Sequence, residues 1–174
     1  MKISIIGDCH CGFDYGGERG DDAFLALDEA ITRSLDSDLI IQAGDLFDSR
    51  ITRQEVFART AKILNRTKGM KTSAKLVGLT GKAEEDLSAS ALQGVPIVVI
   101  HGTHERRSKH LVNPIQALES AGLVIHLHGQ TAVFEIEGKR VAVHGMSGVP
   151  ERYANDCLLK WNPKPVTGAV NILV

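Results

Sequence analysis

The sequence predicts an α/β fold, and three observations support this prediction. Short runs of β-branched and other apolar residues occur at residues 2–6, 39–43 and 96–100, and the first two runs stop at Gly7 and Gly44. Runs of this kind are typical of buried strands that are followed by tight loops. A stretch with helical periodicity lies between the first two runs, so strand alternates with helix as in α/β proteins.

The first helix is expected at residues 23–35, where Asp22 can cap its N-terminus. Apolar side chains recur there at helical spacing, which defines the face that packs on the core. This face consists of Phe24, Leu27, Ala30, Ile31 and Leu35.

A second helix is expected after Thr52, because Thr52 and Glu55 have the spacing of a capping box. Its inner face consists of Val56, Phe57, Thr60, Ile63 and Leu64. The surrounding stretch 50–82 is basic, with nine lysine or arginine residues and a single acid. Glycines interrupt this stretch, and a shorter helix at 83–92 leads into the third strand.

The next helix is well marked, because Asn113 can cap it, Pro114 suits its first turn and Gly122 can end it. Beyond it the pattern changes to short strands. They are expected at residues 124–127, 132–136 and 140–144, and the turn Glu137-Gly138 joins the last two.

A helix near residues 151–159 and an apolar strand at 170–174 follow. Chain termini are usually frayed and polar. We therefore expect the last strand to be buried. Because a buried strand rarely ends a chain, we also expect that this chain is cut short.

Composition restricts the class of protein. A chain of 174 residues with 43% hydrophobic residues suffices for one ordinary domain, which we place at residues 1–174. A net charge of −1 excludes a uniformly basic nucleic-acid-binding protein and an acidic disordered tail. Three cysteines give no disulfide framework, and the N-terminal apolar run is too short for a signal peptide or a membrane span. We therefore expect a cytoplasmic protein that does not enter a membrane.

Polar groups follow all three of the apolar runs. They are Asp8 and His10 after the first, Asp45 and Asp48 after the second, and His104 and Glu105 after the third. In open α/β sheets, ligands bind at this carboxyl edge. Carboxylates and imidazoles together suit manganese, iron or zinc, and a bridging carboxylate can hold two ions about 3.5–4 Å apart for in-line attack on phosphorus. One such residue alone is more often a turn residue, but three in register favour a site.

The segments GDCH, GDLFD and GTHE resemble the first three motifs of the calcineurin-like metallophosphoesterases. Within that superfamily, IIGDCHCG and AGDLFDS most resemble the SbcD-type nucleases that process DNA double-strand breaks. The resemblance implies a β-sandwich flanked by helices, of which this chain would be an N-terminal portion. It also implies a metal-dependent phosphodiesterase or nuclease that acts on DNA.

The resemblance further implies a role for each matching residue. Asp8 and His10 would bind the first of two divalent ions, which we expect to be manganese, and Asp45 would bridge the two ions. His104 would stabilise the transition state or protonate the leaving oxygen. Asp48 and Glu105 would lie behind the ligands and orient them.

The sequence departs from the family pattern at Thr103, where the family has an asparagine that binds the second metal ion. A threonine hydroxyl is shorter and a poorer ligand, so we expect a weaker second site or a water in its place. The family's later histidine motifs have no match. Other histidines could replace them, but a histidine beside a strand is more often structural; the candidates are His101, His126, His128 and His144.

The two cysteines that flank His10, Cys9 and Cys11, are spaced more tightly than zinc ligands usually are, which favours core or loop roles for them.

The basic stretch makes DNA the expected partner, although a charged helix face is more often simply solvated. Arg50 and Arg53, with Arg106, Arg107 and Lys109 beyond the third motif, could form a phosphate-binding track to the metal edge. The resemblance adds a homodimer, formed by helices of this region, and a partner ATPase of the repair complex.

Two alternatives remain open. One is a calcineurin-like phosphatase or phosphodiesterase that acts on small substrates. The other is a non-catalytic DNA-binding or dimerisation module with a degenerate metal edge, which Thr103 and the missing histidine motifs favour.

Overall fold

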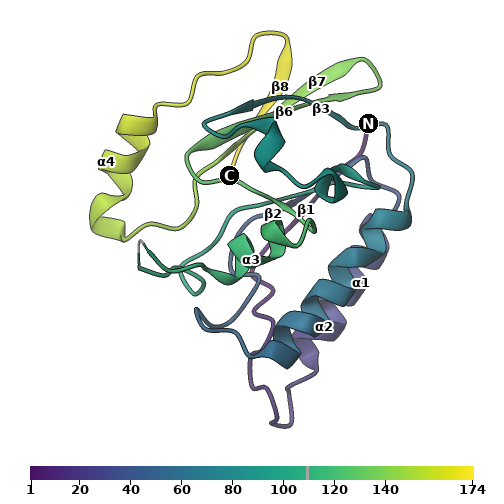
Figure 1. Ribbon diagram of the computed structural model, residues 1–174, viewed down its shortest axis with the longest axis vertical. Helices are drawn as coiled ribbons and strands as arrows, with labels where there is room; N and C mark the ends of the chain where they lie inside the picture. Colours follow the sequence, from purple (N-terminus) through teal and green to yellow (C-terminus); the bar gives the residue numbers. More distant parts are fainter. Residues whose placement is uncertain (109) are drawn as a thin grey trace.

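Two four-stranded β-sheets packed face to face form the centre of the computed structural model, which describes residues 1–108 and 110–174 (Figure 1). The first sheet is parallel, with strands in the order β1, β2, β4, β5. These strands are β1 (Ile3–Ile6), β2 (Leu39–Gln42), β4 (Ile97–Val99) and β5 (Ile125–His126). Lys109, which the sequence adds to the basic track, lies outside the described residues.

The second sheet has the order β3, β6, β7, β8 and is antiparallel except for the parallel pair β7 and β8. Its strands are β3 (Lys75–Thr80), β6 (Gln130–Ile136), β7 (Lys139–Gly145) and β8 (Ala169–Leu173). Glu137 and Gly138 join β6 to β7 with φ of 51° and 75°, the positive values that a tight two-residue hairpin turn requires.

Three helices cover the outer face of the first sheet: α1 (Asp22–Ser34), α2 (Gln54–Leu64) and α3 (Pro114–Ser120). In Figure 1, α1 and α2 lie side by side. Asn113 caps α3, as the sequence predicts, and the structure adds a capping box with Gln116. A fourth helix, α4 (Glu151–Trp161), stands away from the sheets and has no fully buried residue (Figure 1).

The hydrophobic core has two layers, one on each face of the first sheet. The outer layer joins the sheet to the helices through residues such as Phe24, Leu64 and Ile115. The inner layer joins the two sheets through Ile41 and Phe134, among others. Burial on both faces explains why β2 and β4 read as continuous apolar runs in the sequence. The predicted sandwich flanked by helices is confirmed.

The sequence predicts the wrong N-cap residues for α1 and α2. Asp22 lies inside the first turn of α1, and neither helix has a side-chain cap. The Thr52 hydroxyl instead donates to the carbonyl oxygen of Ser49 at 3.1 Å, which leaves Arg53 as the N-cap residue of α2. Local turn bonding of this kind competes with helix capping.

Residues 65–92 also differ from the prediction. Residues 75–80 form the strand β3, in which Leu76 and Leu79 both pack on the inter-sheet core because the register shifts between Leu76 and Gly78. The expected helix at 83–92 is two short 3-10 turns, η2 (Glu84–Asp86) and η3 (Ala89–Leu92), and a further one, η1 (Asn65–Gly69), follows α2.

Two strands that the sequence predicts to be buried are sheet edges. β1 lies at one edge of the first sheet, and its Ile5 is 63% exposed. β8 lies at one edge of the second sheet, and its Leu173 is 61% exposed. For β1 and β8, the apolar sequence therefore does not predict how buried the strand is.

Candidate metal centre

Three loops meet at the carboxyl edge of the first sheet, and they carry the residues that the sequence selects. We call residues 7–12, 43–49 and 101–108 the first, second and third loops. The first and second loops run alongside each other: the backbone N–H groups of Asp8 and His10 donate to the carbonyl oxygens of Gly44 and Asp45 at 3.2 and 2.9 Å. This pairing brings Asp8, His10 and Asp45 together, with one potential ligand atom from each within 4.8 Å of the others.

The backbone of these three residues has an unusual conformation. Asp8, His10 and Asp45 have φ of 51°, 49° and 49°, in the left-handed region that non-glycine residues rarely adopt. Such conformations persist where the surrounding structure enforces them, and they cluster at functional sites. Their presence at all three positions therefore supports a functional role for this edge.

A buried carboxylate joins the third loop to the second. Glu105 is fully buried, and its two oxygens accept hydrogen bonds from the backbone N–H groups of Phe47 (2.8 Å) and Gly102 (2.7 Å). Burial raises the pKa of Glu105 to about 7, although both hydrogen bonds favour its ionised form. Glu105 thus holds the two loops together from beneath.

His104 lies at the surface above this junction. Its backbone N–H donates to Asp45 Oδ1 at 2.9 Å, and its ring Nδ1 lies 3.0 Å from the carbonyl oxygen of Asp48. That hydrogen bond raises the pKa of the imidazole. It also orients the ring and leaves Nε2 as the nitrogen that can exchange a proton with a bound molecule.

Asp48 contacts both histidines of the site. Its Oδ1 lies 3.1 Å from Nδ1 of His10, and the rings of His10 and His104 meet edge to face with centroids 4.7 Å apart. His10, Asp48 and His104 consequently form a second group with potential ligand atoms within 4.8 Å of one another. The structure thus brings Asp48 closer to the ligand set than the sequence suggested.

The donor set fits divalent metal ions. Carboxylates and imidazoles on one edge are the ligands that manganese, iron and zinc accept. Gly102 keeps this edge open, because a Cβ there would lie 2.2 Å from Asp45 Oδ1. Thr103 is exposed on the same loop and offers only a neutral hydroxyl oxygen.

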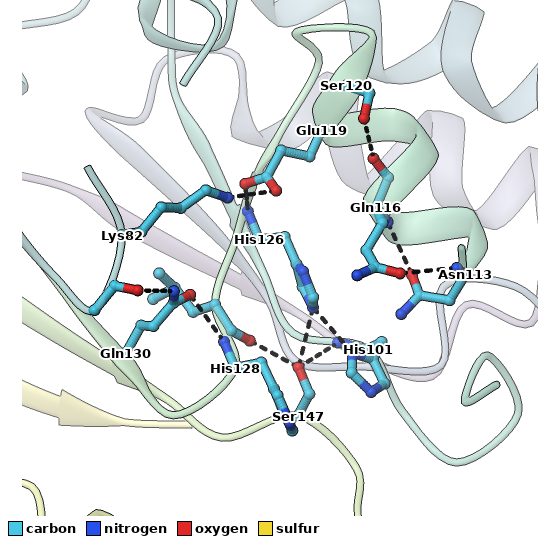
Figure 2. A network of polar contacts seen from close by, with 12 residues as sticks. Lys82, His101, Asn113, Gln116, Glu119, Ser120, His126, His128, Gln130 and Ser147 are labelled. Atoms are coloured by element: carbon cyan, nitrogen blue, oxygen red, sulfur yellow. Dashed lines mark hydrogen bonds and ion pairs between the residues drawn. The ribbon is translucent and has the colours of Figure 1, made fainter. Parts of the chain in front are cut away.

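A polar network that the sequence did not predict supports the third loop (Figure 2). Ser147 accepts a hydrogen bond from the backbone N–H of His101 (3.1 Å) and donates one to the carbonyl oxygen of Leu127 (2.7 Å). His101 Nδ1 lies 2.9 Å from His126 Nε2, so one ring donates to the other. The network ties together the ends of β4, β5 and β7. Nothing in the sequence around Ser147 marks it, because its partners lie 20 and 46 residues away.

Both histidines of this network are held neutral. Burial lowers the pKa of His101 to about 4 and that of His126 to about 3. The His128 ring lies beside His101, with centroids 5.2 Å apart. His144 is likewise enclosed by protein partners, Thr131 Oγ1 at 2.8 Å and Asn171 Oδ1 at 3.0 Å. These contacts agree with structural roles for His101, His126 and His144.

The two cysteines of the first loop pack inward. Burial raises the pKa of Cys9 to about 11 and that of Cys11 to about 12, so both thiols stay protonated. Cys11 belongs to the core beneath the helices.

The described arginines of the predicted track have different surroundings. Arg50, Arg106 and Arg107 line one cleft beside the third loop, whereas Arg53 lies over the ring of Tyr15, 5.6 Å from its centroid. Other cations of the basic stretch form ion pairs with acids at or within α1: Arg59 with the N-cap residue Asp21, and Arg66 on η1 with Asp28. Part of the positive charge therefore holds α2 and η1 against α1.

The chain belongs to the calcineurin-like phosphoesterase family, whose model matches residues 1–165. Among curated proteins, it is similar to the DNA double-strand break repair protein Mre11 of Methanopyrus kandleri, with 32% identity over 165 residues (87% of this chain and 31% of the relative). It is also similar to the double-strand break repair protein MRE11 of Encephalitozoon cuniculi, with 27% identity over 170 residues (87% of this chain and 29% of the relative). The chain thus spans about a third of the length of these relatives.

Among the residues that the structure describes, no helix combines the length and the apolar character that crossing a membrane requires.

Gly102→Ala tests the close approach of the third loop to Asp45. The added methyl group would overlap both the Asp45 carboxylate and its backbone nitrogen, so we expect a loss of about 1–3 kcal/mol in the free energy of unfolding, together with weaker binding of Mn²⁺ in calorimetric titrations. Gly69→Ala is the matched control, since a Cβ there meets nothing within 4 Å. Equal effects of the two substitutions would contradict this packing.

His126→Gln tests the neutral histidine pair. The folded-state pKa values of His101 and His126 lie below the ordinary value of 6.5, so their contribution to stability is present above pH 6.5 and is lost as the pH falls towards 4. In urea titrations, we expect the variant to lose less stability than the wild type between pH 6.5 and 4.5. His110→Gln, at an exposed position, should keep the wild-type dependence; an unchanged profile in His126→Gln would refute the assignment.

Proposed function

We propose that this protein is a metal-dependent phosphodiesterase that cleaves DNA in double-strand break repair. The observation that carries the proposal is the convergence of Asp8, His10 and Asp45 beside the fixed imidazole of His104. The family supports phosphoester hydrolysis, and the names of the two similar proteins support DNA break repair.

Each residue of the edge has a role in this proposal. Two divalent ions, which we propose to be manganese, would polarise the phosphate and activate water. Asp8 and His10 would hold one ion, Asp45 would contact both, and Thr103 would face the second, weaker position. Asp48 orients His10 through the 3.1 Å contact, and Glu105 fixes the loop that carries His104.

His104 would serve as the general acid. The hydrogen bond to the Asp48 carbonyl oxygen raises the pKa of this ring, and Nε2 is the nitrogen left free to give a proton to the leaving oxygen. Because Asp48 and Asp45 hold the ring and the backbone of His104, the proton would be delivered from a fixed position.

The partners of the proposed enzyme follow from the surface as well as from the resemblance. Arg50, Arg106 and Arg107 would bind the DNA backbone, while Arg53 is the least suited because it packs on Tyr15. A groove of about 310 Å³ between the starts of α2 and α3 exposes Ile51 and Val112, which supports the homodimer. A partner ATPase and a cytoplasmic location complete the proposal.

Thr103 favours one further candidate, a DNA-binding module without catalytic activity. In that case the edge would keep its fold but would not bind the metal ions. The salt dependence of binding distinguishes a DNA-cleaving enzyme from a phosphoesterase that acts on small substrates. Binding to DNA should weaken steeply as ionic strength rises, whereas binding of a small substrate should not.

Asp45→Asn and His104→Asn test the proposed mechanism in a manganese-dependent DNA cleavage assay with the complete gene product. We expect His104→Asn to lower the cleavage rate at least about 100-fold while Mn²⁺ binding persists, because proton transfer alone is lost. Asp45→Asn should weaken Mn²⁺ binding and cleavage together. His110→Asn serves as the control.

Two results would overturn the proposal. Wild-type cleavage rates in both variants would exclude these residues from the mechanism. If the complete gene product binds DNA but neither binds a divalent metal ion nor cleaves, the non-catalytic module is the better description.

A further inference from the structure

A cationic cleft of about 720 Å³ lies between the third loop and α4, next to the candidate metal centre. Its walls are Arg50, Arg106, Arg107, Ser108, Pro150 and Tyr153. Three of these six residues are arginines and none is acidic, so the cleft suits an anion.

The cleft adjoins the candidate site through two short connections. Arg50 follows Asp48 by two residues, Arg106 follows His104 by two residues, and His104 Nδ1 lies 3.0 Å from the carbonyl oxygen of Asp48. The cleft is thus a direction in which a polymer bound at His104 can continue along the surface.

The arginines of the cleft are available for such a polymer. Among the residues whose side chains the structure describes, no ion pair engages Arg50, Arg106 or Arg107, in contrast to Arg59 on α2 and Arg66 on η1. Arg107 is oriented by a hydrogen bond from its guanidinium to the carbonyl oxygen of Val112 at 3.0 Å. Oriented guanidinium groups without carboxylate partners are suited to binding phosphates.

Tyr153 adds an aromatic surface to this cationic cleft. It is 46% exposed, and the guanidinium of Arg152 lies 4.6 Å from its ring centroid, which supports the ring from one side. Nucleic acid bases stack on exposed aromatic rings of this kind, but only when they are unpaired and accessible.

The segment that leads into α4 is tied to the third loop by backbone contacts. Gly148 donates to the carbonyl oxygen of His101 at 2.6 Å, and a Cβ on Gly148 would lie 2.8 Å from Gly102. Ser147 binds the N–H of the same His101. Tyr153 therefore lies only five residues beyond Gly148, which is tied to the third loop.

We propose that the cleft is a subsite for an unpaired nucleotide adjacent to the phosphate that is cleaved. Tyr153 stacks on the base, and Arg50, Arg106 and Arg107 bind the flanking phosphates. This inference rests on the proposed function and extends it: the preferred substrate carries single-stranded or unpaired DNA at this position, because a base inside an intact duplex cannot reach the ring.

The test compares fluorescence anisotropy of labelled single-stranded oligonucleotides and blunt duplexes in EDTA, where cleavage cannot occur. Tyr153→Ala should weaken binding of the single strand about 5-fold to 100-fold, the range expected for loss of one stacked base. Its affinity for blunt duplex should stay within about twofold of wild type, since no base stacks there. Tyr153→Phe should retain wild-type binding of both.

Leu159→Ala is the matched control on the same helix, because Leu159 is 67% exposed and does not line the cleft. It should leave both affinities unchanged, and circular dichroism should show that every variant is folded.

The outcomes separate this inference from the proposed function. If the wild-type protein binds neither DNA, the proposed function fails together with the subsite. If it binds both and Tyr153→Ala does not alter binding of the single strand, only the subsite is refuted. In that case, the arginines serve a duplex backbone or an acidic protein segment instead.

Discussion

The buried carboxylate of Glu105 is the contact on which the candidate site depends. By accepting hydrogen bonds from Phe47 and Gly102, it fixes the second and third loops at one separation. That separation lets the backbone N–H of His104 reach Asp45 and the ring of His104 reach Asp48. A carboxylate in this position is costly to bury, and its two hydrogen bonds offset that cost only while both loops stay in place.

The parallel sheet supplies the second constraint. Because β1, β2 and β4 run in the same direction, their carboxyl ends deliver three loops to one edge. Ser147 and the neutral pair His101 and His126 support the third loop from the opposite side. The edge is thus held both from the first sheet and from the end of β7, which leads directly to α4.

The main features of the site could be predicted from sequence because they are local. Each motif directly follows a strand, so finding the strands placed Asp8, Asp45 and His104 at one edge. The supporting contacts could not be predicted in this way. Gly102 and Ser147 matter because of residues that lie next to them only in three dimensions, and no periodic pattern marks such pairs.

Charge and burial were predicted less well for the same reason. The basic stretch reads as one surface, but Arg59 and Arg66 form ion pairs with Asp21 and Asp28 at the N-cap and in the middle of α1, which only tertiary packing brings near. β1 and β8 are apolar enough to be central strands, yet sheet order makes them edges. Helix capping failed at α2 because the Thr52 hydroxyl bonds within its own turn. In each case, a tertiary contact or a local hydrogen bond outweighed the preference that the sequence pattern indicates.

Diffraction at the manganese absorption edge would show whether Asp8, His10 and Asp45 bind a metal ion. For crystals equilibrated with Mn²⁺, we expect an anomalous peak bounded by the side chains of these three residues and a weaker peak on the side of Thr103. Anomalous density elsewhere on the protein, with none between Asp8, His10 and Asp45, would contradict the proposed metal site.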